Sequence, residues 1–167
     1  MDQTGIPSRR PVVAGRWTVK DIVQGKPLGH PSHPMFVHFP SALFPVALVL
    51  DVISLFEPSL MLTRAAFYNI AAGLLMAGGA ALTGLVDYLP MVGGSRKKKL
   101  GTYHLAAQLT AVSAMALSFL ARTFDFHADS TGAVPLALAA VAVSALFVGN
   151  YFGGILVYRQ GMRVSTE

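Results

Sequence analysis

Cysteine is absent from this chain, and charged residues are scarce. Of 167 residues none is cysteine, one is tryptophan and 13% are charged. The absence of cysteine excludes disulfides, thiolate metal sites and iron–sulfur clusters bound by the protein. Hydrophobic residues make up 53% of the chain, and its mean hydropathy is +0.54. This composition is typical of a single-domain integral membrane protein.

Motifs for common enzyme reactions are missing as well. No serine lies in a nucleophile elbow. The glycine pairs at Gly78-Gly79 and Gly93-Gly94 are not followed by the Gly-Lys-Ser/Thr of a phosphate-binding loop. The first thirty residues are polar and do not form a secretory signal. A redox carrier is therefore a better expectation than an enzyme with its own substrate.

Four apolar segments dominate the chain. They cover about residues 35–56, 63–89, 100–121 and 133–158. Each can cross a hydrocarbon layer of about 30 Å at about 1.5 Å per helical residue, and the short connections predict antiparallel neighbours. We expect an all-α, integral membrane four-helix bundle with up-down-up-down topology over residues 29–164. The sequence shows no internal repeat.

The amino-terminal arm, residues 1–28, is basic. Within it Trp17, Val19, Ile22 and Val23 predict a short helix on the membrane surface, although a disordered tail is an equal alternative.

Basic residues lie mostly on one side of the expected bundle. The other side has only Arg64 and Arg122. By the positive-inside rule both termini are expected in the cytoplasm, with the bundle in the inner membrane. The positive charge is then expected to set the orientation in the membrane and to contact anionic lipid, and nucleic-acid binding is not expected. Eleven of the thirteen basic residues share the cytoplasmic side: Arg9, Arg10, Arg16, Lys20, Lys26, Arg96, Lys97, Lys98, Lys99, Arg159 and Arg163.

Small and polar residues recur at helical spacing in three of the spans. Because lipid does not drive large apolar side chains inward, small and polar residues mark the faces where helices meet. These faces are expected to line the inside of the bundle, and Gly149 and Gly153 could also pack against a partner. The stripes are His104, Gln108, Ala111, Met115, Ser118 and Arg122; Asn69, Gly73, Ala77, Ala80, Gly84 and Asp87; and Asn150, Gly154 and Tyr158.

Histidines gather at the start of the first span. Three of the five histidines lie within residues 29–40. The topology is expected to bring His38 to the same end of the bundle as Asp87 and His104. Histidines on two helices are the arrangement that binds b-type haem, so His38 and His104 are the candidate haem ligands. A metal ion could instead use His33, His38, Asp87 and His104.

The sequence predicts other surroundings for the remaining ionisable residues. Asp51 lies deeper than the histidines and is expected to pair with Arg64 or Arg122. His30 and His33 lie among prolines and are both expected to be exposed, although His33 stays a candidate metal ligand. His127 is expected to be solvated in the outer loop. The histidines and Asp87 could also be a hydrogen-bonded clasp that fixes helix packing, and spacing alone favours that interpretation. The protein would then be a structural subunit of a larger membrane complex, or a homo-oligomer.

The same residues resemble an uncharacterised family of bacterial four-helix membrane proteins. The resemblance rests on His33-Pro-Met-Phe-Val-His-Phe-Pro40, on Gly84-Leu-Val-Asp87 and on Gly153-Gly-Ile-Leu-Val-Tyr158, and it covers about residues 29–164. Some relatives carry fused Rieske-type ferredoxin domains, which implies an electron-transfer setting. Ser41 departs from the aliphatic residue that usually follows the opening motif.

Overall fold

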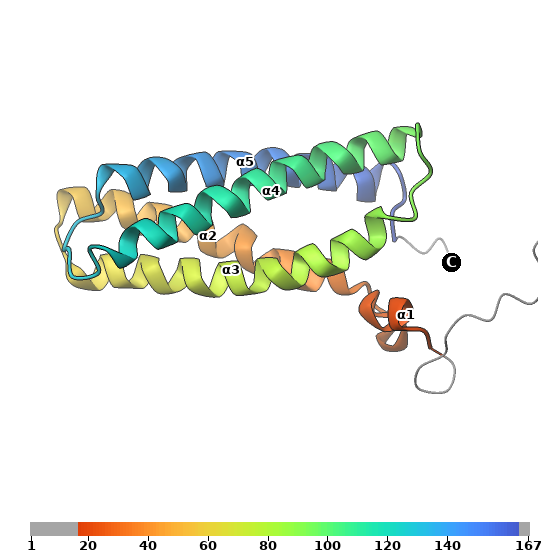
Figure 1. The fold of residues 1–167 in the computed structure, drawn as a ribbon, viewed down its shortest axis with the longest axis horizontal. Helices are drawn as coiled ribbons and strands as arrows, with labels where there is room; N and C mark the ends of the chain where they lie inside the picture. The colour runs from red at the N-terminus through yellow and green to blue at the C-terminus, as the bar shows by residue number, and fades with distance from the viewer. Residues whose placement is uncertain (1–16, 164–167) are drawn as a thin grey trace, which may run out of the picture.

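The computed structural model describes residues 17–163, and they form helices without a β-strand. Four long helices run up and down beside one another, and each is long and apolar enough to cross a membrane (Figure 1). The all-α four-helix prediction is confirmed. Residues 1–16 of the predicted arm and residue 164 lie outside the described residues. The elements are α1 (Val19–Val23), a 3₁₀ turn (Lys26–Leu28), α2 (Ser32–Phe56), α3 (Leu60–Tyr88), α4 (Arg96–Thr123) and α5 (Ala133–Tyr158).

The first long helix begins three residues earlier than its expected start at Met35. Pro34 is the third residue of α2, within the first turn, where a backbone N–H has no partner inside the helix. Proline therefore does not prevent the helix from starting at Ser32. The helix also continues through Pro40 and Pro45. The early start brings His33 into α2.

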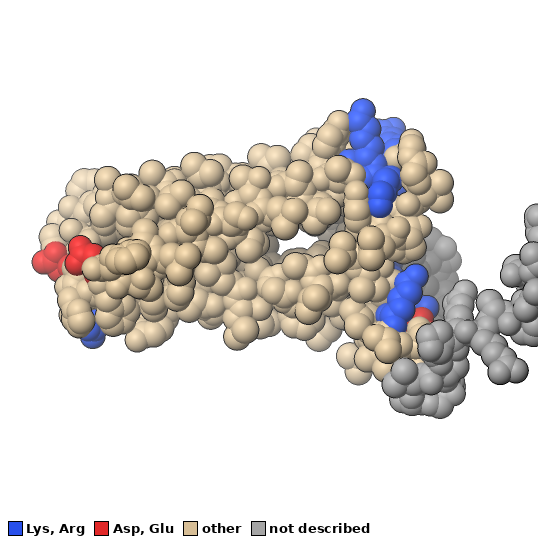
Figure 2. All heavy atoms as spheres, viewed as in Figure 1, with Lys and Arg blue, Asp and Glu red and all other residues tan. Residues whose placement is uncertain are grey.

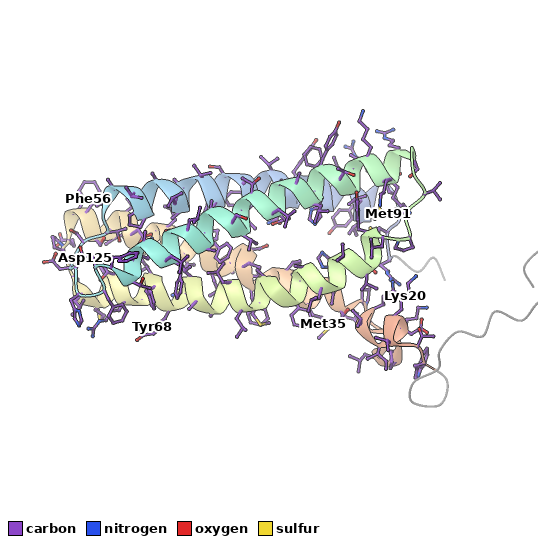
Figure 3. All side chains as sticks on the ribbon, viewed as in Figure 1. Lys20, Met35, Phe56, Tyr68, Met91 and Asp125 are labelled. Carbon is purple, nitrogen blue, oxygen red and sulfur yellow. The ribbon has the colours of Figure 1, made fainter. Side chains whose placement is uncertain are left out.

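The outer surface of the bundle is apolar. Phe56, Tyr68 and Met35 point away from the helices (Figure 3), and their exposed fractions are 77%, 60% and 49%. The inside contains many small side chains, such as Ala47, Ala77 and Ala111, each at most 5% exposed. A surface of large apolar side chains over an interior of small ones suits a bilayer, where lipid covers the surface.

The bundle consists of two helical hairpins. Helices α2 and α3 pack closely along their length, as do α4 and α5, whereas contacts between the two hairpins are fewer. The apolar core that joins the hairpins includes Phe44 and Ile70 from one hairpin and Met115 and Leu146 from the other. The rings of Phe67 on α3 and Phe119 on α4 also stack across this boundary, with centroids 4.5 Å apart. The hairpins are thus the rigid units, joined through a limited interface.

The two hairpins repeat the same burial pattern. Four of the five buried residues of α2 correspond to buried residues of α4 that lie 71 positions later, and five of the seven buried residues of α3 correspond to buried residues of α5 that lie 69 positions later. Because α2 and α4 run in the same direction, an approximate twofold axis along the bundle relates the hairpins. The repeat is hard to detect in the sequence, because few residue identities are retained at these offsets, among them His33–His104 and Gly84–Gly153. The pairs are Pro40–Ala111, Phe44–Met115, Ala47–Ser118 and Asp51–Arg122, then Ile70–Ala139, Gly73–Ala142, Ala77–Leu146, Ala80–Gly149 and Asp87–Leu156.

The ends of the bundle differ in charge. We call the end where α2 and α4 begin the basic end, and the opposite end the Arg122 end. Figure 2 shows lysine and arginine side chains gathered at the basic end and acidic side chains at the Arg122 end. The short helix α1 contacts α3 at the basic end. It begins at a capping box between Thr18 and Asp21, which gives the predicted helix in the arm.

Candidate functional site

Two histidines from different hairpins face each other near the basic end. His33 is on α2 and His104 is on α4, and their ring centroids are 6.3 Å apart with an angle of 85° between the ring planes. Nδ1 of His33 lies 2.9 Å from the carbonyl oxygen of Ala80, and Nδ1 of His104 lies 2.8 Å from that of Gly149. A carbonyl only accepts hydrogen bonds, so each Nδ1 carries the proton. In each neutral ring, Nε2 is therefore the nitrogen with a free lone pair.

A glycine lies under each imidazole ring. A Cβ at Gly84 would lie 2.8 Å from Cε1 of His33, and a Cβ at Gly153 would lie 3.2 Å from Cε1 of His104. Each glycine follows the carbonyl that accepts the histidine's hydrogen bond by four residues, which is about one helical turn. Both hairpins thus hold their histidine in the same way, on a carbonyl and a glycine of the second helix.

The Nε2 atoms have no hydrogen-bond partner within residues 17–163. Both histidines are only partly buried. Figure 2 shows an opening between the two hairpins, in the half of the molecule that carries the basic end. The histidines lie in this half, at the loosely packed boundary between the hairpins.

His38 does not join this pair. The expectation that His38 faces Asp87 and His104 is not met, because its side chain is exposed on the outside of α2. Five residues separate His33 and His38, and at about 100° per residue the two side chains point to different sides of the helix. His33, which was expected to be exposed, takes the interior position. His30 is exposed, as expected, and so is His127.

Asp87 lies one turn beyond Gly84 and binds other partners. It accepts a hydrogen bond of 3.0 Å from Nε2 of Gln24 and forms an ion pair with Arg163. Within residues 17–163 no three histidine, aspartate or glutamate side chains are grouped so that they could hold a metal ion. The expected four-residue metal set is therefore not brought together. A cofactor-binding role for the histidines stays a prediction.

A second polar layer lies deeper in the bundle. Nε2 of Gln108 donates to Oδ1 of Asn150 at 2.9 Å, and Nδ2 of Asn150 donates to Oγ of Ser41 at 3.1 Å. This chain of hydrogen bonds connects α4, α5 and α2. It separates the histidines from the apolar core. Ser41 therefore supplies a hydrogen-bond acceptor between the hairpins.

Asp51 and Arg122 form a closed ion pair at the other end. Two guanidinium nitrogens of Arg122 donate to the two oxygens of Asp51 at 2.7 and 2.6 Å, and Thr131 donates to Asp51 at 2.8 Å. Arg122 also donates to Ser118. The Asp51 side chain is fully buried and that of Arg122 is 8% exposed. The expected pairing of Asp51 with Arg122 is confirmed.

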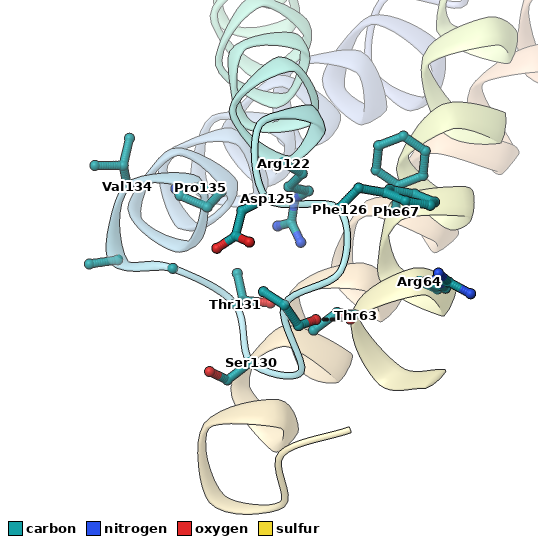
Figure 4. Close-up of a pocket in the computed structure, with 13 residues that line it drawn as sticks. Thr63, Arg64, Phe67, Arg122, Asp125, Phe126, Ser130, Thr131, Val134 and Pro135 are labelled. Carbon is teal, nitrogen blue, oxygen red and sulfur yellow. Dashed lines mark hydrogen bonds between the residues drawn. The ribbon is translucent and has the colours of Figure 1, made fainter. Parts of the chain in front are cut away.

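A pocket of about 320 Å³ opens beside this ion pair. Figure 4 shows Arg122 and Asp125 on one side of the pocket and Thr63, Ser130 and Thr131 on another. The guanidinium of Arg64 lies 5.1 Å from the ring centroid of Phe126. The guanidinium of Arg122 is bound by Asp51 and Ser118, whereas Nε of Arg64, which also lines the pocket, is buried and has no hydrogen-bond partner within residues 17–163.

Three residues of these networks could not be predicted from the sequence. Gln24 and Arg163 bind Asp87 from outside the spans, where no periodicity marks them. Thr131 lies in a loop, and only the tertiary structure brings it to Asp51. His33 had a detectable signal: it precedes Asp51 by eighteen residues, which is five full turns and so the same face of one helix.

The comparisons with known proteins give one result. A family model described as "Predicted membrane protein (DUF2231)" matches residues 29–166. No curated protein and no solved structure matches the chain. The match covers most of the chain, including all four long helices and both histidines of the pair. The chain therefore belongs to this family of predicted membrane proteins.

Proposed function

We propose that this membrane protein is an electron carrier that holds one b-type haem between His33 and His104. The supporting observation is the pair of imidazoles, one from each hairpin, whose Nδ1 atoms are bound to carbonyls and whose Nε2 atoms are free. Histidines that bind a metal through Nε2 commonly donate Nδ1–H to such a carbonyl. The hydrogen bond fixes the tautomer and the ring orientation before any ligand arrives.

The spacing of the rings would allow both Nε2 atoms to bind one metal ion. A metal–nitrogen bond of about 2.0–2.1 Å, with a ring centre about 1.1 Å beyond each nitrogen, gives ring centres at most roughly 6.3 Å apart. The observed centroid distance is 6.3 Å.

Two protein ligands favour haem over a free metal ion. A zinc, copper or non-haem iron site usually needs three or more protein ligands, and no such group occurs within residues 17–163. In haem the porphyrin supplies the other four nitrogens, and the iron supplies a one-electron redox couple. The opening between the hairpins lies in the half of the bundle that holds the histidines.

An absorption spectrum of purified protein tests this function. Protein expressed with haem precursor and purified in detergent should show a Soret band, and the His33→Ala and His104→Ala variants should lose it. His38→Ala is the matched control, because His38 is exposed on the same helix; this variant should keep the band. Wild-type protein that stays colourless and free of iron would refute the haem.

The same hydrogen bonds support a structural function as the second candidate. Each histidine ties the two helices of its own hairpin, so the pair could serve only as a packing clasp in a subunit of a larger membrane complex. In that case His33→Ala should lower thermal stability without any spectral change. The partner surface is not the face with Gly149 and Gly153, since a Cβ at Gly149 would lie 2.7 Å from Gln108 Nε2 and Gly153 faces His104.

We further propose that the protein lies in the inner membrane with its basic end facing the cytoplasm. The described basic residues lie there except Arg64 and Arg122, and the positive-inside rule favours cytoplasmic placement of such an end. Fusion of a fluorescent protein to the carboxyl terminus tests the orientation. The fusion should be fluorescent, whereas a fused alkaline phosphatase should be inactive.

A further inference from the structure

A second pocket, of about 540 Å³, lies at the basic end. Three separate segments line it: α1 and the turn after it, the connection between α3 and α4, and the end of the described chain. In Figure 3 Lys20 and Met91, from two of these segments, lie at the same end of the molecule. The pocket therefore depends on the tertiary structure and occurs where the spans end, at the level of lipid headgroups.

Positive charge dominates the lining. Asp87 is the acidic residue in it, and its carboxylate is already bound by Gln24 and Arg163. Four basic residues line the pocket: Lys20, Lys26, Lys97 and Arg163. The ion pair between Arg163 and Asp87 cancels one positive and one negative charge. The pocket thus keeps an excess of positive charge.

Two of these cations have no counter-ion among the described residues 17–163. Lys26 is bound by Asp21, and the hydrogen bonds from Lys26 and Thr18 lower the pKa of Asp21 far below its usual range, so that carboxylate is ionised. Lys20 and Lys97 have no ion-pair partner within residues 17–163. No carboxylate of residues 17–163 therefore neutralises these two ammonium groups.

Much of the remaining lining is apolar. Pro90, Met91, Val92 and Met162 line the pocket together with Ser95 and Gly161. A phosphate with apolar groups attached to it matches this combination, because the phosphate can meet the ammonium groups while glycerol and acyl carbons meet the apolar side chains. A free inorganic phosphate would gain nothing from the apolar part of the lining.

We propose that this pocket binds the phosphate headgroup of one anionic phospholipid, such as phosphatidylglycerol, through Lys20 and Lys97. The site is separate from the histidine pair and uses none of its residues. Both lysines lie outside α2, α3 and α5, and Lys97 is in the first turn of α4. The lipid would connect α1 to the α3–α4 connection at the membrane surface.

Native mass spectrometry of the detergent-purified full chain tests the proposal. After incubation with equal amounts of phosphatidylglycerol and phosphatidylcholine, the wild type should carry one phosphatidylglycerol in preference. Each Lys→Gln change should weaken binding about fivefold, and Lys20→Gln/Lys97→Gln about 25-fold, if each cation contributes as cations near anionic membrane surfaces do.

The control removes two cations that do not line the pocket. Arg96→Gln/Lys99→Gln changes the same helical turn as Lys97 and should alter phosphatidylglycerol binding less than twofold. An equal loss in both double variants would overturn the proposal in favour of diffuse surface attraction. No preference for phosphatidylglycerol in the wild type would also overturn it. Thermal melts of all variants should match the wild type, because the lysines make no ion pair within residues 17–163.

Discussion

At the Arg122 end, Arg122 donates two short hydrogen bonds to Asp51 across the bundle. Thr131 donates a further hydrogen bond to Asp51, and Ser118 accepts one from Arg122. At the basic end, His33 and His104 occupy the equivalent diagonal position, yet each uses one ring nitrogen within its own hairpin and leaves the other free. One end is a completed network that joins the hairpins. At the other end, the Nε2 atoms of the two histidines have no hydrogen-bond partner within residues 17–163.

The two ends of the bundle also differ in how their side chains pack. The apolar core includes Phe44 at the middle of α2, with Ile70 and Met115 nearer the Arg122 end of their helices, and all three are fully buried. At the basic end the histidine rings lie on glycines, and Figure 2 shows an opening between the hairpins in that half of the molecule. The two ends therefore use equivalent positions of the hairpins differently: an ion pair joins the hairpins at one end, whereas each histidine binds within its own hairpin at the other.

The largest effect is expected from breaking the completed ion pair. Arg122→Leu leaves the buried Asp51 carboxylate without its cation and should lower the free energy of unfolding by about 3–5 kcal/mol. Thermal or denaturant unfolding in detergent measures this loss. The double variant Asp51→Leu/Arg122→Leu should recover most of the stability, because no unpaired charge remains. A single variant as stable as the wild type would contradict the importance of this pair.

Exchanging the two charges tests whether the hairpins are equivalent. Asp51→Arg/Arg122→Asp keeps one ion pair on the same diagonal, because residues 51 and 122 are related by the approximate twofold axis. We expect the swap to recover about half of the loss seen in Arg122→Leu, since Thr131 and Ser118 do not exchange places. The same unfolding experiment measures this recovery. A swap as unstable as the single variant would mean that the axis does not relate the two positions.

At the basic end, packing under a histidine ring should matter less than the ion pair does. Gly84→Ala puts a Cβ 2.8 Å from Cε1 of His33, so the ring must move, at a cost of about 1–3 kcal/mol. Unfolding experiments measure the cost, and the Soret band of haem-loaded protein reports the displaced ring.

Gly78 on the same helix provides the control for this change. Nothing lies within 4 Å of a Cβ at Gly78, so Gly78→Ala should cost no stability. Equal stability of Gly84→Ala and Gly78→Ala would show that the space beside the His33 ring can hold a Cβ. Gly153→Ala should fall between them, because its Cβ would lie 3.2 Å from the His104 ring.

The smallest effect is expected at the second ion pair. Arg163 is 30% exposed at its pair with Asp87, whereas Arg122 is 8% exposed. Arg163→Gln should therefore cost about 1 kcal/mol or less, and the difference from the wild type should shrink in high salt. Unfolding at low and high salt measures both. The loss in Arg122→Leu should not depend on salt, and a salt-dependent loss there would remove the contrast between the two ends.

Much of the interior could be predicted from helical spacing. The stripe from His104 to Arg122 and the stripe from Asn69 to Asp87 both face inward, with Met115, Ser118 and Ala77 buried. Spacing succeeds here because eighteen residues return a helix to the same face. Helical spacing did not identify the inward-facing histidine of α2. The helix was expected to start after Pro34, so an error of three residues excluded His33 from it, and His38 was chosen instead. A proline in the first turn does not end a helix, so composition could not locate that start.

The sequence by itself determined four apolar helices, their order, the inward faces of α3 and α4, and the pairing of Asp51 with a basic residue from the far end; the predicted inner face of α5 was wrong at Tyr158, which is exposed. Hydropathy and helical periodicity are local properties, and short connections leave one simple way to arrange four spans. Only the tertiary structure decided which histidine faces His104, how loosely the hairpins meet, and that Gln24 and Arg163 reach Asp87. Those features depend on helix rotation and on contacts between segments far apart in the chain, which no local pattern records.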